Sequence, residues 1–454
     1  PYRDFFVDWN RFWAGHGEMT DEGYVQPDPE LLAPMFFRKP GLPILMVRFP
    51  DGRDVPYWNT FYQEVVYPRL DPQDLMAEMP IQYGTAREVA ALVNAALDTG
   101  RAPREIEWGA YERYREPVTR LLADRRRYLG QMDVNVRSPL VWDFYEETLR
   151  TLAGYGASIV RLDAFAYASK VPGRRNFLNE PETWEVLGRL RGIADGLGLS
   201  LLPEIHATYA EGVHERIARE GYLTYDFFLP GLILDAFERA DASTLERWAG
   251  EVVERGIRTV TMLGCHDGIP LLDLEGLVPT ERIEALVATV VERGGYVKNL
   301  HGQRETYYQV NATYHSALGA DDRSLLLARA IHLFMPGRPQ VWYLDLFAGT
   351  NDHEAVARAG VGGHKEINRT NLTAEEVERR LAWPVVRDQL TLLRFRHASP
   401  AFGFDARLEI LPAPPGRLAW RWTGEGGATA LLEADLATRS FTVSDGEGNV
   451  VLAQ

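Results

Sequence analysis

The chain has 454 residues, of which 46% are hydrophobic, so it is long enough for one large α/β domain and a smaller one. Its formal net charge of −15 argues against nucleic acid or an anionic membrane surface as a partner, because both require basic patches. A single cysteine, Cys265, excludes an internal disulfide, and no apolar run reaches the roughly 18 residues of a membrane span. We therefore expect a cytoplasmic protein.

The first third of the chain changes character twice. Residues 1 to 60 are rich in aromatic residues and prolines and predict a packed, loop-rich region. From Pro72 to Arg127 the pattern is helical: Thr85 and Glu88 fit a capping box that opens an apolar stripe, and a second helix is expected over 111–128. An arginine run, 125–127, lies near the end of this second helix. We interpret these arginines as solvated residues of the helix C-terminus, where the helix dipole favours positive charge, rather than as a binding patch.

From residue 138 onward helices and strands alternate at the pace of βα units. The strands are continuous apolar runs, which are typical of a parallel sheet buried on both faces. After residue 400 short alternating runs separated by glycine-rich turns predict a small antiparallel β domain. We expect domains over 1–137, 138–399 and 400–454. The expected elements are helices 138–154, 180–197, 231–255, 313–335 and 382–397, and strands 157–163, 199–205, 222–228, 257–264 and 338–346.

Three of these strands end in a carboxylate, namely Asp163, Glu204 and Asp267. In a (β/α) barrel the strand carboxyl ends converge on one face, so the three groups would meet in one pocket. Two carboxylates can cleave a glycosidic bond, one as nucleophile and one as acid and then base, and a third negative group stabilises the oxocarbenium-like transition state. Arg161 would keep Asp163 ionised, and His266 offers a donor for sugar hydroxyls. One such carboxylate alone is more often a helix cap or a structural hydrogen-bonder.

Three blocks resemble those of the α-amylase superfamily, glycoside hydrolase family 13, and further strings resemble its sucrose phosphorylase branch. The resemblance implies a (β/α)8 TIM barrel of the α-amylase type with a C-terminal antiparallel β domain. It also implies a retaining glucosyl transfer through a covalent β-glucosyl-enzyme, in which phosphate intercepts the intermediate to give α-glucose 1-phosphate. The blocks are 161–164, 203–206 and 264–269, and the further strings are 308–314, 339–343 and 367–369.

The resemblance also assigns roles to residues. Asp163 would be the nucleophile, Glu204 the acid/base and Asp267 the transition-state stabiliser. Inorganic phosphate would be the co-substrate of a small α-glucoside, with no cofactor and no metal, in a monomer or homodimer. The implied binding residues are Arg161, His266, Arg369, Gln309 and Tyr308 for the substrate, and Arg38 and Lys39 for phosphate.

The chain departs from the branch at several points. Lys39 stands where an arginine is expected, and a lysine offers a point charge rather than a bidentate fork. Thr306 and Tyr307 replace the acidic and aliphatic residues expected at the fructose site, so sucrose, sucrose 6'-phosphate, glucosylglycerol and glucosylglycerate all stay open as donors. The helical stretch 68–130 is an insertion. A complete member would carry about 150 further residues at the start, with the first barrel strands.

Two alternatives remain beside a phosphorylase. An α-glucosidase or transglucosidase would use water or a sugar in place of phosphate, and a non-catalytic relative would only bind carbohydrate. Cys265 is not expected to be a nucleophile with His266, because neighbouring strand residues point to opposite faces. His353 and His364 lack the spacing of metal ligands.

Overall fold

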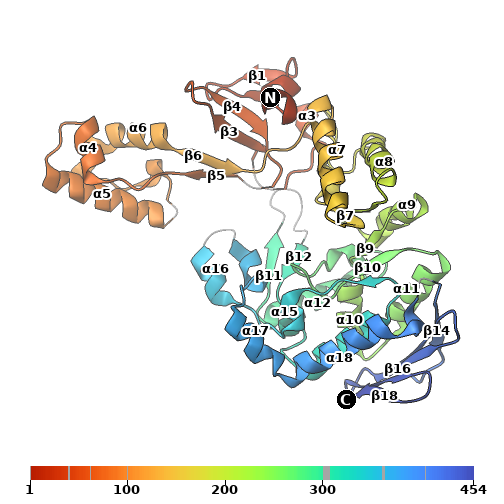
Figure 1. Ribbon diagram of the computed structural model, residues 1–454. Helices are drawn as coiled ribbons and strands as arrows, with labels where there is room; N and C mark the ends of the chain where they lie inside the picture. The colour runs from red at the N-terminus through yellow and green to blue at the C-terminus, as the bar shows by residue number, and fades with distance from the viewer. Residues whose placement is uncertain are drawn as a thin grey trace. The chain divides into compact units, whose positions relative to one another are not determined.

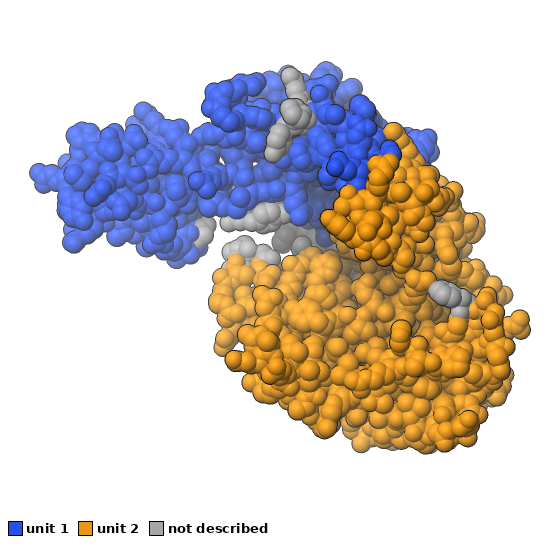
Figure 2. Space-filling view, in the orientation of Figure 1, with its two compact units in different colours: residues 1–148, 167–188 blue, residues 149–166, 189–454 orange. Residues whose placement is uncertain are grey.

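The computed structural model describes residues 2–38, 41–61, 63–99, 101–299, 307–359, 363–403 and 405–454. They form two compact units (Figure 2): unit 1 holds residues 1–148 and 167–188, and unit 2 holds 149–166 and 189–454. The domain boundaries expected after residues 137 and 399 stay predictions. Among the described residues, no helix has both the length and the apolar character that a membrane crossing requires.

The first 60 residues of unit 1 hold short antiparallel hairpins around a cluster of tryptophans. Trp9, Trp13 and Trp58 are almost fully buried, and their rings contact one another. This aromatic cluster forms the core of the region, which the composition predicted to be packed and loop-rich. The elements are α1 (Tyr2–Phe5), α2 (Trp9–Phe12), β1 (Gly17–Met19), β2 (Val25–Pro27), α3 (Pro29–Leu32), β3 (Ile44–Arg48) and β4 (Asp54–Trp58).

A helical lobe follows, closed by the antiparallel pair of β5 (Gln63–Val66) and β6 (Arg127–Gly130) (Figure 1). The capping box expected at Thr85 is wrong, since it forms instead on the preceding helix, where Asp71 caps. The helix expected over 111–128 ends at Arg125, because β6 begins two residues later, and Arg125 pairs with Asp74 at 2.8 Å. The lobe helices are α4 (Pro72–Glu78), α5 (Tyr83–Asp98), η1 (Pro103–Glu105), η2 (Gly109–Tyr114) and α6 (Arg115–Arg125).

Five parallel strands confirm the α/β prediction for unit 2. β7 pairs with β8, and β10 pairs with β9 on one side and with β13 on the other. Leu223 N donates to Leu201 O at 3.3 Å and links the two ladders, so the strands follow in chain order, as in a (β/α) barrel. Their bounds are β7 (Ile159–Leu162), β8 (Ser200–Pro203), β9 (Thr224–Asp226), β10 (Thr259–Thr261) and β13 (Arg338–Pro339).

All five expected strands are shorter than predicted, and two of the expected helices break into two. Helix 231–255 is two helices, because Ala240 adopts a left-handed conformation with φ 48°. Helix 313–335 also breaks: its first part ends at Ala317, Gly319 and Ala320 follow with φ of 81° and 55°, and Asp321 caps the next helix. Strand 338–346 ends at Pro339. The helices of this part are α7 (Pro139–Gly154), α8 (Glu182–Asp195), α9 (Val213–Arg219), α10 (Leu229–Arg239), α11 (Ser243–Glu254), α12 (Thr280–Glu292), α13 (Tyr314–Ala317), α14 (Asp322–Phe334), α15 (Tyr343–Leu346), α16 (His353–Ala359), α17 (Ala374–Leu381) and α18 (Pro384–Ala398).

The chain ends in a five-stranded antiparallel sheet whose strands pair in chain order, which confirms the expected β domain. Trp420 and Leu432 of this sheet belong to the same hydrophobic core as α14 and α18. The Trp422 indole N–H donates to Phe334 O at 2.8 Å, so the sheet is also hydrogen-bonded to α14. The strands are β14 (Arg407–Leu411), β15 (Arg417–Thr423), β16 (Thr429–Asp435), β17 (Ser440–Asp445) and β18 (Val450–Ala453).

Candidate active site

Two of the predicted carboxylates leave the sheet side by side. Leu162 stands opposite Pro203 in the parallel pair of β7 and β8, so Asp163 and Glu204 are the first residues beyond each strand. Glu204 N donates to Leu162 O at 3.0 Å and extends the ladder to the carboxylate itself. The sheet register therefore places both groups at one edge, as consecutive strand ends predict.

Arg161 bridges these two carboxylates. Its Nη1 lies 2.6 Å from Asp163 Oδ1 and its Nη2 lies 2.7 Å from Glu204 Oε1, and Ala164 N donates to Glu204 Oε2 at 2.8 Å. Burial lowers the pKa of Arg161, but the charges of Glu204 and Asp163 outweigh burial and raise it, so the guanidinium stays charged. The Asp163 side chain is 76% exposed and the Glu204 side chain only 11%. Asp163 is thus open to a substrate, while Glu204 is held in place.

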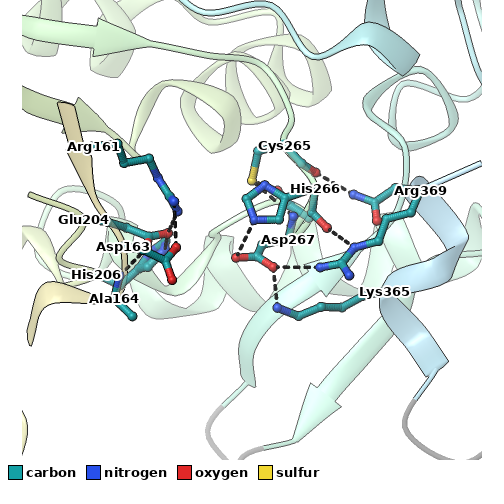
Figure 3. Close-up of polar contacts among 12 residues, drawn as sticks. Arg161, Asp163, Ala164, Glu204, His206, Cys265, His266, Asp267, Lys365 and Arg369 are labelled. Atoms are coloured by element: carbon teal, nitrogen blue, oxygen red, sulfur yellow. Dashed lines mark hydrogen bonds and ion pairs between the residues drawn. The ribbon is translucent and has the colours of Figure 1, made fainter. Parts of the chain in front are cut away.

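The third carboxylate, Asp267, lies among cations (Figure 3). Lys365 contacts its Oδ1, Arg369 Nη2 lies 3.3 Å from the same oxygen, and His266 Nε2 lies 3.6 Å from Oδ2. Burial raises the pKa of Asp267, but Lys365, His266 and Arg369 together lower it to about 2. The carboxylate is therefore ionised throughout the physiological pH range, as a stabiliser of positive charge requires.

Side-chain donors form hydrogen bonds to the backbone carbonyls of the turn that carries Asp267. Asn368 Nδ2 donates to Cys265 O at 2.6 Å, Arg369 Nε to His266 O at 2.9 Å, and Asn311 Nδ2 to Asp267 O at 2.7 Å. The donors come from η6 (Gly363–Asn368), the residue after it, and β12 (Tyr307–Asn311), which pairs with β11 (Tyr296–Asn299). The tertiary structure thus brings residues 44 to 103 positions apart into one cluster.

Gly268 allows the close approach of this turn to β12. Its φ is 110°, and a Cβ there would lie 2.5 Å from Val310 O. A side chain at this position would push the turn, and Asp267 with it, away from the strand.

The Arg161 group and the Asp267 group face each other in Figure 3. Lys365, which contacts Asp267 directly, is a residue of this site that the sequence interpretation missed. No local spacing pointed to it, because η6 is a 3-10 helix that ends at Asn368, before Arg369.

The contacts described above do not include the other predicted residues. Gln309 is buried on β12. Arg38 belongs to unit 1, where its guanidinium lies 5.3 Å from the Phe61 ring centre. Lys39 and the side chain of Tyr308 lie outside the described residues. Their roles stay predictions.

Two smaller predictions concern thiol and metal chemistry. Burial raises the pKa of Cys265 to about 12, which keeps the thiol protonated and unsuited to nucleophilic attack. Within the described part of the chain, His214, Glu215 and Glu251 bring possible ligand atoms within 4.8 Å of one another. Arg255 already pairs with both carboxylates there, so the group is explained as an ion-pair network.

A parallel α/β sheet with carboxylates directly after two successive strands, whose covering helices share a core with a C-terminal antiparallel sheet, is the arrangement of the α-amylase type of glycoside-active enzyme. No protein-family model matches the chain. It is 51% identical to the sucrose 6(F)-phosphate phosphorylase of Ilumatobacter coccineus over 452 residues, covering 98% of this chain and 76% of that protein. It is 28% identical to the sucrose phosphorylase of Streptococcus mutans, covering 99% and 77% of the two chains.

A comparison with solved structures points to the same family as these sequence relatives. The crystal structure of sucrose 6F-phosphate phosphorylase from Thermoanaerobacter thermosaccharolyticum superposes with a TM-score of 0.75 at 29% identity, covering 100% of this chain and 76% of that chain. The chain belongs to the sucrose phosphorylase branch of the α-amylase superfamily, whose members compared here are glycoside phosphorylases. It spans about three quarters of the length of these relatives.

Proposed function

We propose that the chain carries out phosphorolysis of sucrose 6F-phosphate, yielding α-glucose 1-phosphate and fructose 6-phosphate. The observation that carries the choice of donor is the 51% identity over 452 residues to a sucrose 6(F)-phosphate phosphorylase. Thr306 and Tyr307, which replace the residues expected at the fructose site of sucrose phosphorylases, support a donor other than sucrose.

In the first step Asp163 attacks the anomeric carbon. An ester bond forms between its carboxylate and C1 as the bond from C1 to the fructosyl oxygen breaks, and Glu204 gives its proton to that oxygen. The exposure of Asp163 and its pairing with Arg161, which keeps this carboxylate ionised, support the role of nucleophile. Asp267, ionised among its cations, would stabilise the positive charge that develops on the sugar.

In the second step a phosphate oxygen attacks C1 and breaks the ester. Glu204, now ionised, takes the proton of the incoming phosphate, and Asp163 leaves as a carboxylate. Two inversions at C1 give overall retention. We assign Arg38 and Lys39 to phosphate binding, on the likeness of their segment to the phosphate loop of the branch.

The test is product release by the full-length protein, with and without phosphate. We expect glucose 1-phosphate from sucrose 6F-phosphate only when phosphate is present, with kcat/KM at least about tenfold above that for sucrose. Asp163→Asn should abolish turnover. Asp195→Asn, which changes an exposed aspartate at the end of α8, should not.

Other products would change the proposal. Free glucose without any need for phosphate would indicate the hydrolase alternative. Turnover of sucrose equal to that of its phosphate would refute the proposed donor while keeping the reaction.

A further inference from the structure

A buried aspartate contacts the backbone just before the turn that carries Asp267, and it takes no part in the mechanism above. Asp345, in α15, is 1% exposed, and its Oδ2 accepts a hydrogen bond from Gly264 N at 3.0 Å. Gly264 lies three residues after the end of β10 and three residues before Asp267. The contact therefore fixes the backbone where the chain leaves the sheet toward the proposed stabiliser.

Gly264 permits this approach because it has no side chain. A Cβ at this position would lie 3.0 Å from Asp345 Oδ2 and 3.3 Å from Oδ1. Either the carboxylate or the end of the strand would then have to move, because a packed interior has no spare room for an added methyl group. The carboxylate and this stretch of backbone are thus fitted to each other.

A buried arginine supplies the counter-charge. Burial raises the pKa of Asp345 to about 6, although the charge of Arg329 opposes the rise. Hydrogen bonds from the backbone N–H groups of Gly264 and Tyr314 oppose it as well, so Asp345 is ionised at neutral pH. Arg329 is fully buried in α14, and Gln389 links the two residues: it accepts from Arg329 Nε at 2.9 Å and donates to Asp345 O at 3.2 Å.

The bond from Tyr314 extends the contact to a second segment of the site. Tyr314 lies three residues after Asn311 of β12, whose side chain donates to Asp267 O at 2.7 Å. Asp345 thus accepts from both chain segments that meet at the Asp267 turn, the end of β10 and the start of α13. A buried ion pair of this kind adds little net stability, because desolvation offsets most of its attraction. Its hydrogen bonds nevertheless fix the backbone in one arrangement.

Resting on the proposed function, we infer that Asp345 is a positioning residue, whose carboxylate fixes the backbone at Gly264 and so holds Asp267 where positive charge develops on the sugar. Its burial keeps it from contact with a substrate, so it acts through Asp267. A stabiliser of developing charge acts mainly in the transition state. Its displacement should therefore lower kcat and leave the KM of the donor nearly unchanged.

The test compares two replacements of Asp345 in the full-length protein. Asp345→Asn keeps an oxygen that can accept from Gly264 N, whereas Asp345→Ala removes it, and both leave Arg329 without this counter-charge. For phosphorolysis of sucrose 6F-phosphate we expect kcat of Asp345→Ala to fall about tenfold or more, with KM within about twofold of wild type. Asp345→Asn should retain kcat within about threefold, because the acceptor remains.

A second variant leaves the buried pair intact. Gly264→Ala places a Cβ against the carboxylate and should give the same split between kcat and KM. Asp235→Ala is the matched control: it removes a buried aspartate of α10 that bonds Arg282 instead. It should lower Tm and leave kcat within about twofold of wild type. Circular dichroism gives the folded fraction to which each rate is normalised.

Three results would decide against the inference or its basis. Wild-type kcat in folded Asp345→Ala would overturn it, and if that variant does not fold, wild-type kcat in Gly264→Ala would do so. An equal loss in Asp345→Asn and Asp345→Ala, or a KM that rises in step with the fall in kcat, would show a merely structural role and also overturn it. Wild-type protein that releases no glucose 1-phosphate from sucrose 6F-phosphate or sucrose would instead overturn the proposed function, so the two failures are distinguishable.

Discussion

At the residue scale, the site is built from carboxylates that each meet a cation. Arg161 contacts Asp163 and Glu204, and Lys365 contacts Asp267. The folded pKa of Asp267, about 2, lies below its ordinary 3.8. Its ionised form therefore contributes stability above about pH 4, and that contribution is lost as the pH falls through 2. The cations make the negative charge permanent at working pH.

Replacement of Lys365 tests this arrangement. In Lys365→Met the pKa of Asp267 should rise, because its strongest cationic partner is gone while the burial remains. The acidic limb of kcat/KM for phosphorolysis should then move to higher pH, which a pH–rate profile measures. Lys365→Arg keeps the charge and should retain the wild-type limb. Identical limbs in Lys365→Met and wild type would refute the role of Lys365.

At the element scale, the helical lobe between β5 and β6 has a hydrophobic cluster of its own. All of its members among the described residues fall between positions 67 and 122. Leu75 of α4 and Val89 of α5 are fully buried, although α4 has only seven residues. Tertiary burial within the lobe stabilises these helices more than their intrinsic propensity does.

Two neighbouring residues of α4 provide a matched pair. Leu75 is fully buried and Met76 is 45% exposed. Leu75→Ala should lower the free energy of unfolding of the lobe by about 2–5 kcal/mol, whereas Met76→Ala should change it by no more than about 0.5 kcal/mol. Hydrogen exchange of peptides within residues 67–122 measures both. Equal exchange in the two variants would contradict a separate lobe core.

At the scale of the whole molecule, unit 2 joins its α/β part and its C-terminal sheet in one core. Trp420 and Val443 of the sheet belong to the same cluster as Phe334 of α14 and Val386 of α18. An interface of this kind buries apolar surface from both sides, so neither side retains its core when the other unfolds. We expect the two parts to unfold together.

A tryptophan comparison tests this cooperativity. Trp420 is fully buried and Trp383 is 36% exposed. Trp420→Ala should cost about 3–5 kcal/mol and move the loss of the helices and of the sheet in unit 2 to lower temperature together. Trp383→Ala should have a much smaller effect. Circular dichroism and hydrogen exchange follow the two parts, and a sheet that melts before α14 would contradict the shared core.

Local patterns in the sequence predicted the type of element best where a regular hydrophobic pattern runs through the whole element. The apolar runs before Asp163 and Glu204 are parallel strands, and the alternating runs after residue 400 are an antiparallel sheet. The long helices expected over 231–255 and 313–335 were wrong because left-handed residues, Ala240 in the first and Gly319 with Ala320 in the second, interrupt the helix, and a new helix begins a few residues later.

The sequence by itself determined the superfamily and the places of Asp163 and Glu204 directly after their strands, because each depends on residue types within a few positions of one another. Only the tertiary structure decided which groups meet the carboxylates and the turns that carry them. Lys365 reaches Asp267 across 98 residues, and Asp345 reaches Gly264 across 81. Contacts of that span arise when several βα units pack together, and no local periodicity encodes them.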